Sequence, residues 1–237
     1  MLFNWLVTGG VLATNPAHAV RGPKHVVKTG KTTVLDADQA RTLLDSIPIT
    51  RTVKLADGTV TEAPDLVGLR DRALISMMTY AFGRISAVLG MRVEDYYPQG
   101  KRWWVRLHEK GGERHEMPAH HNLEAYLDAY IRATGIGDDA KSPLFRSANR
   151  RTGTLTGNRI HRIDAWRMVQ RRAVAAGLIV HVGNHSFRAT GITGLSECRR
   201  HAGNAQIMAA HESPRTTKLY DRTGDEITLD EVERIAI

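Results

Sequence analysis

Apolar residues recur at three- and four-residue steps along the stretch that follows Asp65, from Leu66 to Phe82. This spacing predicts an amphipathic helix whose apolar stripe belongs to the core. Asp36 or Asp38 can cap an earlier helix across residues 39–44. The same periodicity predicts further helices at about 122–134, 158–176, 186–196, 203–210, 214–220 and 228–236.

Two short runs with the composition of strands, residues 103–107 and 113–117, flank the glycine turn Lys110-Gly111-Gly112. They predict a pair of antiparallel strands, with the adjacent tryptophans packed on and around the sheet. The Asp57-Gly58 pair predicts a tight turn, and a hairpin is one reading of residues 51–64. The predicted fold class is therefore mainly α with a small antiparallel β-sheet, an α+β architecture.

The beginning of the chain differs from the rest. It reads as the end of a helix followed by a basic linker from Arg21 onward. An apolar opening before Ala17-His18-Ala19 superficially resembles a signal peptide, but no basic residue precedes Arg21 and glycines interrupt the run. No stretch of eighteen apolar residues occurs, so we expect no membrane span. We assign residues 1–30 to an appendage with its linker and residues 31–237 to one domain.

The charge balance favours a polyanionic partner. The formal net charge is +8, and the stretch from Arg146 to Arg172 holds eight arginines and a single acid, Asp164. A solvated surface normally mixes signs, so this stretch favours a phosphate-contacting surface over an ordinary solvated face. The single cysteine, Cys198, excludes an intramolecular disulfide and a Cys-rich zinc cluster, and favours a reducing, cytoplasmic setting. The candidate DNA-binding arginines are Arg146, Arg150, Arg151, Arg159, Arg162 and Arg167.

Four separated pieces of sequence carry candidate chemistry. They are Gly83-Arg84-Ile85-Ser86, Glu109-Lys110-Gly111-Gly112, His185-Ser186-Phe187-Arg188, and His211 with Tyr220 nine residues later. Each is weak alone, but in their order and spacing the chain resembles the tyrosine recombinase (phage integrase) family over about residues 35–236. The resemblance implies a catalytic domain of that family, without a cofactor, acting on double-stranded DNA as a homo-oligomer, tetrameric in the synapse. It also implies one active site made of Arg84, Lys110, His185, Arg188, His211 and Tyr220.

The residue types fit that chemistry. Two guanidinium groups, from Arg84 and Arg188, can neutralise the charge that grows on a phosphate when no metal is present. A tyrosine has an ordinary pKa of about 10, so Tyr220 needs a base or a strongly positive site to attack phosphorus at neutral pH. His185 is the candidate base, and it lies three residues before Arg188, on the same face of a helix. Lys110 is the candidate acid for the departing 5′ oxygen, and His211 the candidate donor of a hydrogen bond to the phosphate.

The chain departs from the family pattern in several places. Ala87 stands where an acid is common three residues after the first arginine, and Ala210 stands where glycine usually precedes the second histidine. The segment 196–203 is crowded with charge. Only residues 3–6 and the Asn15-Pro16 pair resemble the tail of a DNA-clamping N-terminal domain, so the expectation is a truncated or partner-dependent recombinase.

Other readings stay open. The chain can be a non-catalytic DNA-binding remnant, or an enzyme that relaxes DNA strands like a type IB topoisomerase. Arg84, Lys110, His211 and Tyr220 each have a structural reading, as an ion-pair partner, a turn lysine, a surface histidine and a packed aromatic. His115, His120 and His121 lack the spacing of a zinc site. The C-terminal residues 229–235 fit docking on a neighbouring protomer as well as packing on their own core.

Overall fold

A computed structural model describes residues 2–20, 32–109, 112, 114–149 and 151–197, with helix α7 (Asn184–Glu197) as its last element. The helices predicted at 203–210, 214–220 and 228–236, like the charged segment after residue 197, lie outside the described residues. In chain order, the elements before α7 are α1 (Leu2–Thr8), α2 (Ala37–Asp45), β1 (Thr50–Lys54), β2 (Val60–Pro64), α3 (Leu66–Tyr80), α4 (Ile85–Gly90), the 3-10 helix η1 (Val93–Asp95), β3 (Tyr96–Gln99), β4 (Arg102–His108), β5 (Arg114–Pro118), α5 (His121–Thr134), β6 (Arg146–Ala148), β7 (Leu155–Arg159) and α6 (Arg162–Ala175).

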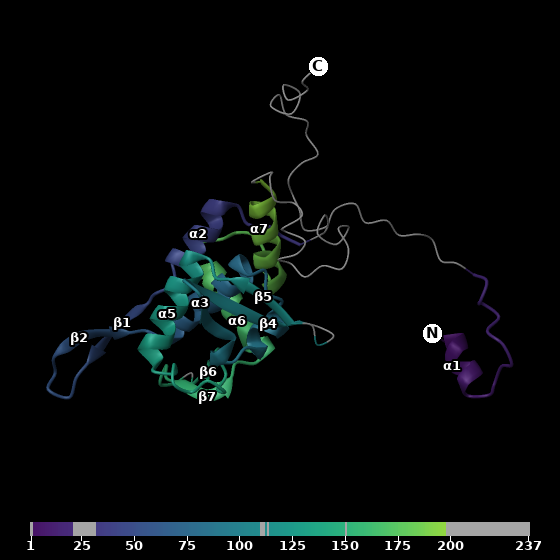
Figure 1. Ribbon diagram of the computed structural model, residues 1–237, viewed down its shortest axis with the longest axis horizontal. Coiled ribbons are helices and arrows are strands. Elements are labelled where there is room, and N and C mark those ends of the chain that lie inside the picture. Colours follow the sequence, from purple (N-terminus) through teal and green to yellow (C-terminus); the bar gives the residue numbers. More distant parts are fainter. Residues whose placement is uncertain (1, 21–31, 110–111, 113, 150, 198–237) are drawn as a thin grey trace, which may run out of the picture.

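Helix α3 lies at the centre, packed between α5 and α7 (Figure 1). Asp65 caps it, because the side-chain oxygen accepts hydrogen bonds from the amides of Val67 (3.0 Å) and Gly68 (3.1 Å). The predicted apolar stripe is buried, but so are Ile75 and Thr79 on the opposite side of the helix and the charged residues Arg70 and Asp71. The helix is therefore buried around most of its circumference, so the prediction of an amphipathic helix is wrong, whereas the assignment of the apolar stripe to the core is confirmed.

The buried charges of α3 form an ion cluster with α6. The carboxylate of Asp71 is 1% exposed and lies 2.5 Å from Arg70 Nη2 and 2.8 Å from Arg172 Nη2. A buried carboxylate is tolerated when charge-assisted hydrogen bonds compensate its lost hydration. Arg172, one of the eight clustered arginines, thus fastens α6 to the central helix.

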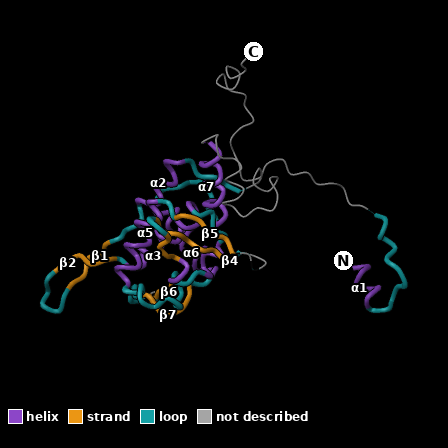
Figure 2. Tube along the Cα trace, viewed as in Figure 1, coloured by secondary structure: helices purple, strands orange, loops and turns teal. Residues whose placement is uncertain are grey.

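The described residues form three small antiparallel sheets (Figure 2). The sequence predicted one sheet, with a hairpin as one reading of residues 51–64, and β1–β2 confirms that hairpin. The β1–β2 hairpin projects from the body and turns at Gly58, whose φ of 87° favours glycine (Figure 1). The sheet β3–β4–β5 contains the two predicted strands together with β3, which the sequence reading missed. Trp103 stacks on Tyr96 across the β3–β4 pair, with 4.4 Å between ring centroids.

The predicted helix at 158–176 begins too early. Strand β7 extends to Arg159 and pairs with β6, and α6 then begins at Arg162 with His161 as its cap. The Nδ1 atom of His161 accepts a hydrogen bond from the amide of Ile163 (3.3 Å). The β6–β7 pairing is a contact between segments, which helical periodicity cannot register. The predictions at 122–134 and 186–196 are confirmed by α5 and α7.

The observed architecture is α+β with small antiparallel sheets, as predicted. Asp36, not Asp38, caps α2, and it does so in a capping box with Gln39. Helix α1 buries none of its residues. Within the described ranges, no helix combines the length and the apolar character needed to cross a bilayer.

Candidate active site

Arg188 lies in the second turn of α7, and only 2% of it is exposed. Its Nη1 atom donates a hydrogen bond to the main-chain carbonyl of Phe82 in the turn between α3 and α4. Phe82 has a φ of 50°, in the left-handed region that residues with a side chain rarely adopt. The turn is also crowded, since a Cβ on Gly83 would come within 2.4 Å of Val88. Arg188 is therefore anchored to a tightly built turn.

Arg84 lies two residues beyond Phe82, at the N-cap of α4. Its backbone is extended and not helical, so Arg84 lies just outside the first turn of α4. The Nη1 atom lies 2.5 Å from Oε2 of Glu109, which directly follows strand β4. The Arg84 side chain is 32% exposed and the Glu109 side chain 3%. Both predicted arginines are thus held by contacts around one turn, one by a carbonyl and the other by a carboxylate.

His185 lies in the first turn of α7, three residues before Arg188, and lines a pocket of about 460 Å³. Burial lowers the pKa of its imidazole below the ordinary value, and the positive charges of Arg188, Arg162 and Arg84 lower the pKa further, in that order. The imidazole is therefore neutral at pH 7 and able to accept a proton. Because Arg84 and Arg188 both act on the imidazole, His185 lies near both predicted arginines.

The wall of this pocket comes mainly from α6 and the segment leading into α7. Arg162, Ile163 and Trp166 of α6 face it, and Ile163 and Trp166 are 52% and 44% exposed. Sequence reasoning placed Arg162 on a DNA-binding surface and gave Trp166 no role. The sequence held a signal for this part of the pocket. Ile163 and Trp166 are large apolar residues on the otherwise polar face of a basic helix.

The other clustered arginines have different surroundings. Arg151 and Arg159 are exposed, and Arg167 is 54% exposed with Asp164 at 3.7 Å. Arg146 is only 18% exposed and donates to Ser142 Oγ (2.8 Å) and Asp139 (3.4 Å). The predicted basic surface therefore contains at least two arginines, Arg146 and Arg172, that are largely engaged by protein groups.

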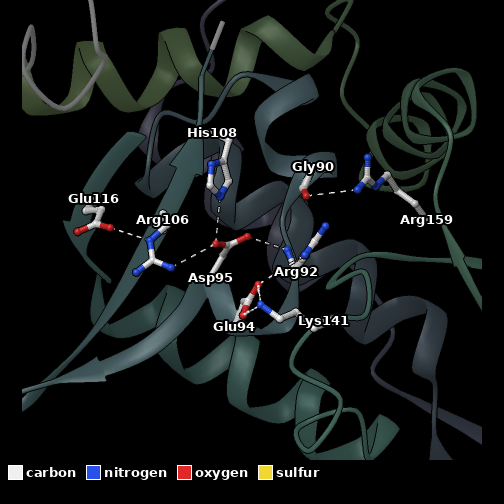
Figure 3. Close-up of polar contacts among 9 residues, drawn as sticks. All are labelled: Gly90, Arg92, Glu94, Asp95, Arg106, His108, Glu116, Lys141 and Arg159. Carbon is white, nitrogen blue, oxygen red and sulfur yellow. Dashed lines mark hydrogen bonds and ion pairs between the residues drawn. The ribbon is translucent and has the colours of Figure 1, made fainter. Parts of the chain in front are cut away.

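A polar network supports β4, the strand that ends just before Glu109 (Figure 3). The buried carboxylate of Asp95 accepts a hydrogen bond from the Arg92 amide (2.9 Å) and contacts His108 (3.2 Å) and Arg106 (3.6 Å). Arg106 also lies 2.6 Å from Glu116 on β5. These contacts fix the end of β4 and hence the position from which the Glu109 side chain reaches Arg84.

The described structure brings together three of the six predicted site residues, Arg84, His185 and Arg188. Lys110, His211, Tyr220 and the DNA-binding candidate Arg150 lie outside the described residues. Sequence reasoning gave no role to Glu109, although it is part of the hairpin motif. In the part of the chain that is described, no group of three or more His, Cys, Asp or Glu residues could hold a metal ion.

The chain is similar in sequence to tyrosine recombinases. The tyrosine recombinase XerD of Mycobacterium leprae (strain TN) is 28% identical over 226 residues, which cover 92% of this chain and 65% of the relative. The tyrosine recombinase XerC of Salmonella typhi is 25% identical over 221 residues, with 92% and 64% covered. The chain thus spans less than two thirds of the length of either relative.

Solved structures share the fold. XerH site-specific recombinase bound to difH substrate, in a pre-cleavage complex, aligns with a TM-score of 0.64 at 17% identity, over 99% of this chain and 62% of that one. A lambda integrase tetramer bound to a Holliday junction aligns with a TM-score of 0.58 at 18% identity, over 95% and 57%. At these identities the likeness concerns the fold. Residues 34–226 match the phage integrase family, and this range includes the elements that carry Arg84, His185 and Arg188, so the chain belongs to the phage integrase family.

Proposed function

We propose that the chain is the catalytic portion of a site-specific DNA recombinase that cuts and rejoins strands through a covalent bond to Tyr220. One observation carries the proposal. Arg84 and Arg188, which are 104 positions apart in the sequence, are held around a single turn with a neutral histidine beside them. Two guanidinium groups and a base at one place suit phosphoryl transfer without a metal.

In the proposed reaction, the phenolic oxygen of Tyr220 forms a bond to the phosphorus of a DNA phosphodiester. His185 accepts the phenolic proton, which its lowered pKa allows at neutral pH. The bond from phosphorus to the 5′ oxygen breaks, and Lys110 donates a proton to that oxygen. The products are a 3′-phosphotyrosyl link and a free 5′-hydroxyl, and no net charge is gained or lost.

The arginines would act on the charge of the transition state. Arg84 and Arg188 present planar donors that can pair with the non-bridging oxygens as negative charge grows there. His211 would add a further hydrogen bond to the phosphate. Because the phosphotyrosyl link retains the energy of the original bond, a 5′-hydroxyl from the same or another duplex can reverse the step without ATP.

The proposed partner is double-stranded DNA, and the exposed arginines of β7 and α6 support this. Arg162 lines the pocket of His185, Arg167 lies on the same helix, and Arg159 ends the strand that precedes it. We extend the same role to Arg146, Arg150 and Arg151. We further propose homo-oligomeric assembly on DNA, as in the lambda integrase tetramer, a cytoplasmic, nucleoid-associated location, and an origin in a mobile element.

The test is covalent trapping on DNA. A pool of 5′-labelled duplexes with a randomised centre and a nick loses its short 5′-hydroxyl fragment after cleavage, so adducts accumulate and their sequences can be read. The wild-type chain should form adducts that resist denaturation by detergent, and Tyr220→Phe should abolish them. Tyr97→Phe, which removes the hydroxyl of a half-buried tyrosine on β3, is the matched control and should leave them unchanged.

The alternatives give other results. DNA binding by the wild-type chain without any adduct would identify a non-catalytic DNA-binding remnant. Adducts accompanied by relaxation of a supercoiled plasmid at concentrations where the chain is monomeric would favour strand relaxation like that of a type IB topoisomerase.

A further inference from the structure

Glu109 is a buried carboxylate directly beside the candidate site. It follows the last residue of β4, and its side chain is only 3% exposed. Burying a carboxylate removes its hydration, which is tolerated only when charge-assisted hydrogen bonds replace the lost water. In the described part of the chain, that compensation comes from Arg84, whose Nη1 atom lies 2.5 Å from Oε2 of Glu109.

The contact leaves Arg84 able to bind something else. A guanidinium group has five N–H donors, and the hydrogen bond to Glu109 uses one of them. The Arg84 side chain remains 32% exposed, whereas Arg188 is almost fully buried. Glu109 therefore restrains the direction of an arginine that still has donors to offer.

Neighbouring residues do not supply this restraint. Ala87, on the helix that Arg84 caps, is buried and carries no carboxylate. The carbonyl of Phe82 is already bonded to Arg188. The position of Glu109 is itself secured, because its own carbonyl accepts a hydrogen bond from the amide of Gly112 (3.3 Å), whose φ of 84° favours glycine.

We propose that Glu109 is a positioning residue, which holds the Arg84 guanidinium in the direction needed to bind the scissile phosphate. This inference rests on the proposed function, in which Arg84 contacts that phosphate. Glu109 also directly precedes Lys110, the proposed acid, in the sequence.

Charge and position predict opposite effects, which makes the proposal testable. Glu109→Gln removes a negative charge close to an anion site, so electrostatics alone would tighten the binding of phosphate. Loss of positioning would weaken it, because a long arginine side chain released from its partner samples many rotamers. The sign of the change therefore distinguishes a positioning carboxylate from one that merely neutralises Arg84 or competes with phosphate for it.

The measurement uses the whole chain and inorganic phosphate as the probe. Phosphate is titrated at pH 7 while the ring resonances of His185 are followed by NMR. Glu109→Gln should raise the Kd for phosphate about tenfold, the loss expected for one misplaced charge-assisted contact. Glu62→Gln makes the same chemical change at an exposed position of β2, on the hairpin that projects from the body, and should leave the Kd unchanged.

A second variant covers the case in which Glu109→Gln does not fold. Glu109→Asp keeps the charge but shortens the reach to Arg84, so it should also raise the Kd, by less than the glutamine variant. A Kd that is unchanged or lowered in the folded Glu109 variants would overturn the proposal. Failure of the wild-type chain to bind phosphate would overturn both this proposal and the phosphate site. Phosphate binding with the expected Glu109 effect, but without covalent adducts, would contradict strand cleavage alone.

Discussion

The surroundings of His185 determine the protonation state of its imidazole. Burial and three arginine charges lower its pKa, and the arginines come from different parts of the chain. The first turn of α7 helps to form the site, since the amide of Gly183 donates to Ser186 Oγ (3.0 Å) and its carbonyl accepts from the Ser186 amide (2.9 Å). At the residue scale, the site therefore places the imidazole of His185 in a positive environment.

Replacing Arg162 with alanine should raise the pKa of His185 toward its ordinary value, because one of the charges that disfavour the imidazolium is removed. NMR titration of the ring checks this. Since only the neutral imidazole accepts a proton, adduct formation should rise with pH through the His185 pKa, and the rise should move to higher pH in Arg162→Ala. Arg171→Ala, an exposed change on the same helix, is the control. An unaltered His185 pKa in Arg162→Ala would refute the argument.

At the element scale, the close approach of α7 to α3 determines where His185 and Arg188 lie. A Cβ built on Gly191 would come within 2.1 Å of the carbonyl oxygen of Thr79 and 2.5 Å of the Phe82 ring. Glycine at this position lets α7 contact the end of α3 and the turn that follows it. Gly191 therefore contributes to the site by allowing this close packing, and not through a polar group.

Gly191→Ala should destabilise the fold by about 1–3 kcal/mol, because the added methyl group forces two packed helices apart. Gly194→Ala lies on the same helix, where a Cβ meets no atom within 4 Å. It should be neutral or stabilising, by up to about 1 kcal/mol, since alanine favours the helix over glycine. Urea unfolding of both variants measures the difference. Equal stabilities for the two variants would contradict the close packing.

At the scale of the whole molecule, only some of the arginines behind the net charge of +8 remain available to bind a partner. Buried Asp71 engages Arg172, so this arginine serves the fold. Arg159 of β7 and Arg167 of α6 remain exposed, and Arg162 lines the His185 pocket. The surface that we propose for DNA is therefore smaller than the arginine cluster in the sequence.

Each of Arg159→Ala and Arg167→Ala should reduce the salt dependence of DNA binding by about one counterion, seen as the slope of log K against log salt. The reason is that an arginine paired with a phosphate releases a counterion on binding. Arg41→Ala, which removes an exposed side chain of α2, should leave the slope unchanged. Fluorescence anisotropy with a labelled duplex at several salt concentrations measures the slopes. Equal slopes for all variants would place the DNA surface elsewhere.

The sequence alone determined much of the local structure and the family. Helical periodicity predicted α5 and α7, and the glycine turn predicted β4 and β5, because these signals depend on neighbours a few residues apart. Motif order predicted that Arg84, His185 and Arg188 belong to one site; the fold brings the three near one another, and their catalytic roles remain predictions. Lys110, His211 and Tyr220 remain predictions, and so do the boundary between appendage and domain and the DNA-binding role of the arginines.

Tertiary structure decided what depends on contacts between distant segments. It enclosed α3 on both faces, paired β7 with β6 so that the helix expected from residue 158 begins at Arg162, and assigned Arg172 to Asp71 rather than to a surface. It also placed Glu109 against Arg84, 25 positions away. A residue's partner across the fold is fixed by how the elements pack. Periodicity and composition describe only the face that an element presents, so they identify which residues are candidates and leave open what each one touches.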